Sequence, residues 1–300
     1  MAIKTVKATI NGQTYDLTLN SASGKWEATI TAPGKTSYNL AGGYYNVSVE
    51  ATNDAGTKGS ADASTVDGLK LVVKETVAPV ITIVSPTAGA YVANSKQPVV
   101  FNITDETGGS GVDISTLVVK QDGTAVAAAN ITHTAISNGY SVTYTPSAAL
   151  SDGSHTVTIN CKDHDGNAAE EKSTTYTVDT VPPTLNVTSP ADDLITAASS
   201  VTVAGTTNDA TSSPVVITIS LNGTDQGTVP VGTGGTFSKV VTLKEGSNTI
   251  IVKAKDAAGK ESSVTRTVTL DTSVPKIKAA TITPNPVDTG KTMVISVTIE

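Results

Sequence analysis

The chain has 300 residues, a formal net charge of −7 at pH 7 and only 4% aromatic residues. Its apolar residues are mainly Val, Ile, Leu and Ala, and Gly, Ser and Thr are frequent, which is typical of β-branched strands joined by tight turns. The Lys and Arg residues form no cluster, which argues against nucleic acid as a partner. The single cysteine, Cys161, excludes an intrachain disulfide, and no apolar run is long enough to span a membrane, so no membrane partner is expected.

Residues 1–10 alternate between apolar and polar side chains, as a half-buried strand does. This segment lacks the continuous apolar run of a secretory signal peptide, and residues at the other end show no wall-sorting or lipidation motif. We therefore expect the chain to be made in the cytoplasm, without an export signal of its own.

Tight hairpins are predicted at three Asx-Gly pairs, each of which lies between alternating segments. The pairs are Asn11-Gly12, Asp122-Gly123 and Asn222-Gly223. An Asx-Gly pair favours the two-residue turn that matches the twist of antiparallel strands.

Two other signals repeat along the chain. A strand that ends in an Asx-x-x-Gly turn occurs at residues 49–56, 159–166 and 252–259. A proline join follows each turn; Pro79 and Pro183 are 104 residues apart, and Pro183 and Pro275 are 92 apart. A period near 100 residues indicates an array of small domains rather than one large fold.

The strand pattern and turn spacing of each repeat favour a seven-strand immunoglobulin-like sandwich, so we expect an all-β fold of tandem sandwiches in an elongated array. Cys161 falls on the inward face of its strand and is interpreted as a small buried residue. The predicted domains are an Ig-like domain without its opening strands at 1–76, Ig-like domains at 77–180 and 181–273, and a two-strand segment at 274–300.

The first and last of these parts are complementary, because residues 276–300 supply the opening strand pair that residues 1–76 lack. An uncovered sheet attracts another strand. Three outcomes remain open. The first domain compensates internally through residues 33–43 and 57–67; residues 276–300 complete another copy or another protein; or they form a loosely packed tail.

No catalytic set emerges from the sequence. The three histidines, His133, His155 and His164, lack partners at metal-ligand spacing, and the chain has neither a nucleophile elbow nor a phosphate-binding loop. We expect a protein that is not an enzyme and needs no organic cofactor.

Calcium is the one ligand that the sequence raises. Asp163, Asp165 and Asn167 alternate through a glycine turn, as oxygen ligands of a calcium loop do, and residues 105–113 form a second acidic, Gly-rich loop. The alternative is an ordinary turn in which Asx side chains bond to their own backbone.

The Asp-x-x-Gly turn, the join at residues 179–184 and the Ser-Pro pairs at residues 85–86 and 189–190 resemble the repeats of bacterial Ig-like domain arrays. The whole chain is similar to Ig-like proteins encoded among the tail genes of phages and prophages of Gram-positive bacteria. This resemblance implies a virion structural protein of the tail or baseplate, made in the host cytoplasm. Its partners would be other tail proteins or copies of itself.

The alternative function is a bacterial surface adhesin or carbohydrate-binding array, whose partners would be host cell-surface glycans. Ig-like modules serve both classes of protein, and their fold does not choose between them.

Overall fold

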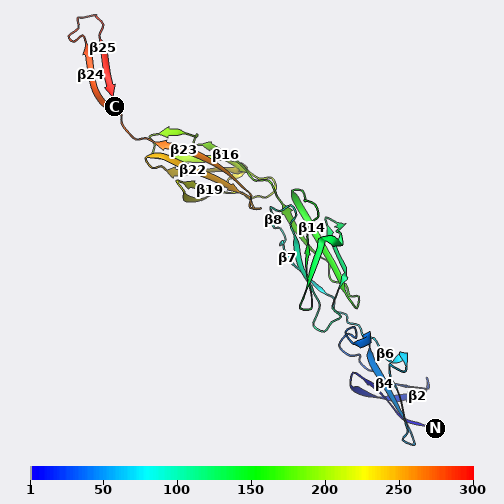
Figure 1. The fold of residues 1–300 in the computed structure, drawn as a ribbon. Helices are drawn as coiled ribbons and strands as arrows, with labels where there is room; N and C mark the ends of the chain where they lie inside the picture. Colours follow the sequence, from blue (N-terminus) through cyan, green and yellow to red (C-terminus); the bar gives the residue numbers. More distant parts are fainter. Residues whose placement is uncertain (1) are drawn as a thin grey trace. The chain divides into compact units, whose positions relative to one another are not determined.

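The computed structural model describes residues 2–300, and its regular structure is almost entirely β-strand (Figure 1). The only helices in this range are three-residue 3-10 turns. None of them has the length and apolar character needed to cross a membrane. The chain divides into two compact units, residues 1–179 and residues 180–300.

Within the first unit, the first domain is a single antiparallel sheet of six short strands. Its strands are β1 (Ile3–Ile10), β2 (Gln13–Asn20), β3 (Lys25–Glu27), β4 (Tyr45–Asn53), β5 (Lys58–Ala61) and β6 (Lys70–Leu71). The order is β3-β2-β1-β4-β5, and β6 also pairs with β4. No second sheet faces it within residues 2–76. The segment 57–67 supplies β5, an edge strand, and 33–43 forms no strand, so neither builds the missing layer.

The second domain is a complete two-sheet sandwich. Its nine strands are β7 (Val80–Ser85), β8 (Tyr91–Val92), β9 (Val99–Thr104), β10 (Val112–Gln121), β11 (Thr124–Ala125), β12 (Ile131–Ile136), β13 (Gly139–Tyr144), β14 (Gly153–Asp163) and β15 (Lys172–Val178). One sheet has the order β11-β10-β14-β15-β8 and the other β12-β13-β9-β7. Alternate residues of β14, including Cys161, are fully buried in the core, as the period-2 pattern predicts.

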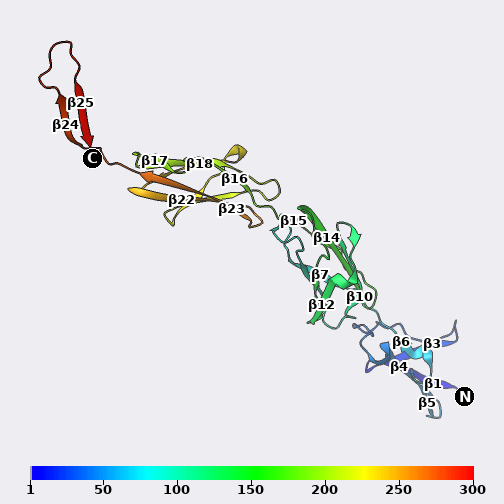
Figure 2. The same ribbon diagram turned by 45° about the horizontal axis from the view of Figure 1, so that its top comes forward.

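The second unit contains another complete sandwich. Its strands are β16 (Thr184–Ser189), β17 (Leu194–Thr196), β18 (Ser200–Asn208), β19 (Val216–Leu221), β20 (Thr224–Val229), β21 (Thr236–Thr242), β22 (Gly246–Lys255) and β23 (Glu261–Leu270). Its sheets are β16-β18-β21 and β17-β23-β22-β19-β20. The sandwich is followed by a separate two-strand hairpin, β24 (Ile277–Thr283) and β25 (Val294–Ile299), visible in red in Figure 2.

The β24–β25 hairpin corresponds to the opening strand pair of a sandwich. β24 pairs with β25 in the antiparallel sense in which β7 pairs with β9 and β16 with β18. Nearly every hairpin residue is exposed, whereas Ile81, Phe101 and Ile103 of the β7–β9 pair are buried. The two strands therefore pair with each other, and their apolar face is uncovered.

The predicted all-β class of tandem sandwiches is confirmed by the two complete domains. The three Asx-Gly hairpins are also confirmed, since each pair joins two antiparallel strands and both of its residues have positive φ angles.

Candidate site at the joint between the first two domains

The turn predicted as a calcium loop lies between β14 and β15 and folds on itself. The carboxylate of Asp163, only 2% exposed, accepts hydrogen bonds from the backbone N–H of Asn167 at 2.8 Å and from its side-chain amide at 2.7 Å. These hydrogen bonds stay within the turn, as in the alternative of an ordinary turn whose Asx side chain bonds to nearby backbone. Both carboxylate oxygens of Asp163 therefore have a hydrogen-bond partner within the turn itself.

Asp165, at the tip of the same turn, contacts the first domain. Its Oδ2 accepts hydrogen bonds from the hydroxyl of Thr36 at 2.6 Å and from the backbone N–H of Glu75 at 3.0 Å. The ammonium group of Lys74 donates to its backbone carbonyl at 3.2 Å. The second predicted residue thus acts as a connector between domains.

Three more contacts belong to this surface, which we call the joint. It consists of residues 36–39 and 74–75 of the first domain and residues 109–110 and 164–167 of the second. The side-chain amide of Asn39 donates to the carbonyl of Gly109 at 2.6 Å. The amide of Asn167 donates to the carbonyl of Glu75 at 3.2 Å. The rings of Tyr38 and His164 stack with centroids 4.5 Å apart and an interplanar angle of 9°.

A group of carboxylates lies at the joint, beside the predicted turn. Oxygens of Glu75, Asp105 and Glu106 lie within 4.8 Å of one another. Glu75 follows the last strand of the first domain, and the two other residues follow β9 of the second. One Glu75 oxygen accepts a hydrogen bond from the N–H of Ser110, and Oδ2 of Asp105 accepts one from Gly111 at 2.7 Å.

The environment of Asp105 favours its neutral form. Burial of its carboxyl raises the pKa, the hydrogen bond from Gly111 opposes that rise, and the negative charges of Glu75, Asp163 and Asp165 add to it. The net effect is a raised pKa. Burial first, and neighbouring negative charge second, therefore disfavour the ionised form of Asp105.

The structure thus brings Asp163, Asp165 and Asn167 together in one turn and leaves their calcium role a prediction. Sequence reasoning missed Glu75 and did not single out Glu106. The sequence does contain a signal for Glu75. An acidic residue lies four positions before each of the repeated prolines Pro79, Pro183 and Pro275; these acids are Glu75, Asp179 and Asp271.

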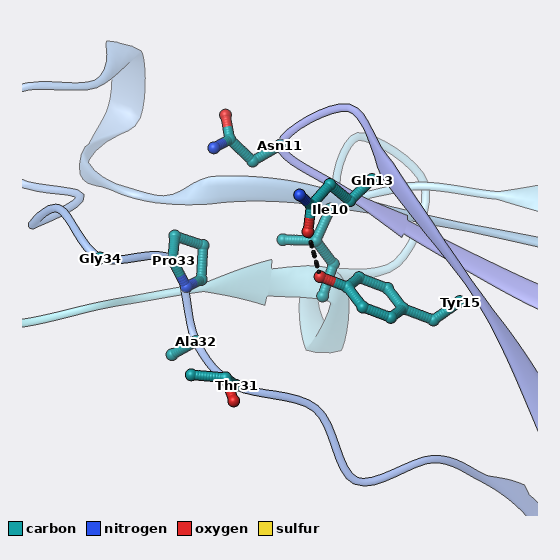
Figure 3. A pocket seen from close by; sticks show the side chains of 8 residues that line it. All are labelled: Ile10, Asn11, Gln13, Tyr15, Thr31, Ala32, Pro33 and Gly34. Carbon is teal, nitrogen blue, oxygen red and sulfur yellow. Dashed lines mark hydrogen bonds between the residues drawn. The ribbon is translucent and has the colours of Figure 1, made fainter.

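A separate polar pocket of about 430 Å³ lies on the first domain, between the β1–β2 hairpin and residues 31–34 (Figure 3). Asn11, Gln13 and Tyr15 lie along one side, and the Tyr15 hydroxyl donates to Oε1 of Gln13 at 2.7 Å. None of its lining residues is a His, Cys, Asp or Glu. The pocket offers hydroxyl and amide groups without an acid, a base or a nucleophilic thiol.

The histidines are all engaged in structural contacts. His155 bonds to Asp122 and to the carbonyl of Ser151, His164 stacks on Tyr38, and His133 meets the ring of Tyr140 edge-on.

Comparisons with protein families identify two modules in tandem. Residues 88–180 match the model of a bacterial Ig-like domain, and residues 183–272 match the model of glucodextranase domain B. No curated protein matches the chain.

Similar solved structures are multidomain Ig-like or fibronectin-like arrays. Fibronectin(III)-like modules of Clostridium thermocellum CbhA are 15% identical and cover 64% of this chain and 94% of their own, with a TM-score of 0.42. A 1.5-MDa bacterial ice-binding adhesin is 24% identical, covering 89% of this chain and 86% of its own (TM-score 0.32). The glucan-utilization protein SGBP-B of Bacteroides ovatus is 16% identical, covering 93% and 62% (TM-score 0.24).

Proposed function

We propose that this chain is a non-enzymatic array of Ig-like modules that serves as a spacer and weak binding segment on a bacterial cell surface. The joint is the observation that carries the proposal. Hydrogen bonds and a ring stack tie loops of one module to loops of the next, and they use residues outside both module cores. Such contacts favour one arrangement of the two modules over others, which suits a spacer.

The absence of an enzymatic role rests on the placement of the reactive residues. The histidines are committed to structural contacts, and Cys161 is buried with a raised pKa caused mainly by burial of its thiol. A buried thiol of this kind is inert. The adhesion role includes host cell-surface glycans as partners, for which the hydroxyl- and amide-lined pocket on the first domain has suitable chemistry.

The second candidate is a structural protein of a phage tail or baseplate, located in the virion. Its support is the resemblance of the whole sequence to Ig-like proteins encoded among tail genes. An array of modules without a catalytic set suits this role as well.

Immunogold labelling of producing cells and of purified phage particles separates the two candidates. The surface proposal expects label on intact cells and saturable retention of the purified chain on cell walls. Label confined to particles, with no retention on walls, would overturn it and favour the virion role.

We also propose that copies of the chain associate through residues 276–300. The apolar face of the β24–β25 hairpin is uncovered, and the first domain has one sheet and an apolar hollow of about 260 Å³ lined by Ile10, Val47 and Leu71 among others. The two surfaces have the chemistry of the missing halves of one sandwich.

A further inference from the structure

We propose that Asn11 is a site of spontaneous covalent modification, in which its side-chain amide is lost by cyclisation onto the backbone nitrogen of Gly12. The product is a mixture of aspartate and isoaspartate at residue 11, in the turn between β1 and β2. The reaction needs only water as a co-reactant. It does not depend on whether the array serves a cell surface or a virion.

The reaction begins at the peptide N–H of Gly12. Its nitrogen loses the proton to hydroxide and attacks Cγ of Asn11; the new N–Cγ bond closes a five-membered imide, and the Cγ–Nδ2 bond breaks to release ammonia. Water then opens the imide at either carbonyl, which gives aspartate or isoaspartate. No atom is oxidised or reduced, because an NH₂ group is exchanged for OH. Glycine favours this attack, since it has no Cβ to hinder the nitrogen and adopts a wide range of backbone angles.

The chain offers an internal comparison, because its sequence contains three Asn-Gly pairs. They are Asn11-Gly12, Asn138-Gly139 and Asn222-Gly223. All three asparagines are exposed, and their φ angles are similar, at 49°, 58° and 52°. Differences in reactivity must therefore come from what holds each side chain and each glycine.

The side chain of Asn11 is held by nothing. Its amide makes no hydrogen bond within residues 2–300, and Figure 3 shows it turned away from Gln13 and Tyr15. A Cβ atom at Gly12 would meet nothing within 4 Å, so the turn has room to change its backbone angles. Both reacting groups can therefore move toward each other without breaking a contact of the folded chain.

The side chain of Asn222 is held at both ends. Its Oδ1 accepts a hydrogen bond from the backbone N–H of Thr249 at 2.8 Å, and its Nδ2 donates to Oδ1 of the fully buried Asn248 at 3.0 Å. Both bonds must break before Cγ can reach the next nitrogen. At about 1 kcal/mol for each bond, this slows the reaction by roughly tenfold or more.

The Asn138-Gly139 pair is restrained in another way. Nδ2 of Asn138 donates to the hydroxyl of Thr107 at 2.8 Å. Gly139 is paired in β13 and lies so close to β9 that a Cβ atom would be 2.0 Å from the carbonyl oxygen of Ile103. The attacking nitrogen of this pair cannot change its position without separating the two strands.

The modification would alter the polar pocket on the first domain. Asn11 lines this pocket, whose lining residues include no Asp, Glu, Lys or Arg. The product carboxylate would give the pocket a negative charge. Isoaspartate would also insert an extra carbon into the backbone of a turn whose tight geometry joins β1 to β2.

The test follows the full chain during incubation at pH 8, in native buffer and in denaturing urea. Mass spectrometry of the tryptic peptides 8–25, 121–162 and 173–239 measures the three asparagines separately, and isoaspartate-specific methylation identifies the rearranged product. In the folded chain we expect Asn11 to convert at least about ten times faster than Asn222 or Asn138. In urea the three rates should converge, because the restraints are lost.

The key variant is Asn11→Gln, whose amide would have to close a larger ring, and it should abolish the conversion at residue 11. Asn222→Gln is the matched control and should leave the rate at Asn11 unchanged. The proposal is overturned if Asn11 is unmodified after a month at pH 8 or if Asn138 or Asn222 converts as fast in the folded chain. It is also overturned if the ratio of the rates is the same in urea, since the fold would then not select the site.

Discussion

Tyr176 carries a buried hydroxyl group without a hydrogen-bond partner. Its side chain is fully buried in the core of the second domain, and burial, followed by the proximity of Tyr144 and Asp122, raises its pKa to about 12. An unpartnered buried hydroxyl costs about 1–3 kcal/mol of stability.

Removing this hydroxyl is therefore expected to stabilise the second domain. We predict that Tyr176→Phe raises the free energy of unfolding by about 1 kcal/mol, measured by urea denaturation at pH 7. The exposed Tyr91→Phe serves as control and is expected to change nothing measurable. A lower free energy of unfolding for Tyr176→Phe would contradict the interpretation that the buried hydroxyl destabilises the second domain.

His155 and Asp122 form a pH-sensitive pair. Nδ1 of the ring lies 2.7 Å from the carboxylate, and Nε2 lies 2.8 Å from the carbonyl of Ser151, so both nitrogens face acceptors. Burial lowers the pKa of His155, but the hydrogen bonds and the charge of Asp122 outweigh it and leave the pKa raised. Burial likewise raises the pKa of Asp122, and the bonds from His155 and Thr156 outweigh it and lower it.

The signs of these two shifts define a pH window. The raised pKa of His155 contributes stability that is complete below its unfolded pKa near 6.5 and is lost as pH rises through the folded value. The lowered pKa of Asp122 contributes stability that is lost as pH falls through its own folded value. Between pH 6 and pH 9 we predict that the native chain loses about 1 kcal/mol, since half-exposed Asp122 is screened by solvent.

Asp122→Asn keeps the acceptor for the Thr156 N–H and should flatten this pH dependence, measured by urea midpoints from pH 6 to pH 9. His133→Gln, which removes a histidine outside this pair, is the control and should leave the profile unchanged. If the urea midpoint of Asp122→Asn changed with pH in the same way as that of the native chain, the His155–Asp122 pair would not be the source of the pH dependence.

At the scale of strands, β13 depends on the glycine with which it begins. A Cβ atom at Gly139 would lie 2.0 Å from the carbonyl oxygen of Ile103 in the paired strand β9, so no side chain fits there. Gly123, in the β10–β11 hairpin, has a positive φ of 80° but open space around it.

We predict that Gly139→Ala destabilises the second domain by about 3 kcal/mol or more, because the backbone of two paired strands must separate. Gly123→Ala meets only the φ penalty and should cost about 1 kcal/mol. Thermal midpoints of both variants, measured beside Gly59→Ala, check the ranking. If Gly139→Ala and Gly123→Ala lowered the thermal midpoint equally, the strands would accommodate the added Cβ atom at Gly139 with little loss of stability.

Elements were predictable where the signal is local. The Asx-Gly hairpins and the alternating strand β14 follow from turn chemistry and period-2 burial, which short segments encode by themselves. The single-sheet form of the first domain was not fully predictable, because residues 57–67 could have built either an edge strand or a facing layer. Only pairing with β4 decides this, and that choice depends on contacts distant in sequence.

At the scale of the whole molecule, the candidate site could not be predicted for the same reason: its residues are distant from one another in sequence. Thr36 and Asp165 are 129 residues apart in sequence yet share a 2.6 Å hydrogen bond. Sequence spacing identified the turn at 163–167 as acidic, but it did not indicate which loop of the first domain this turn would contact. The carboxylates of Glu75 and Asp105 become a group only when two domains meet, and no pattern within one repeat contains both.

The last prediction concerns association between copies of the chain. In the β24–β25 hairpin, Ile282 pairs with Ile295 and Ala280 with Val297, so one face is apolar, and these Ile and Val side chains are 44–60% exposed. The equivalent β7–β9 face is buried under a second sheet, and a two-stranded hairpin alone is marginally stable in water.

If the apolar face of the β24–β25 hairpin covers the open sheet of another copy, sedimentation equilibrium of the full chain shows a mass above that of the monomer. Deleting residues 276–300, or introducing Val297→Asp, should then restore the monomer, whereas Thr298→Asp on the opposite face should not. A native chain that stays monomeric at high micromolar concentration would contradict the association, because it would show that the uncovered face of the hairpin does not bind the open sheet of another copy.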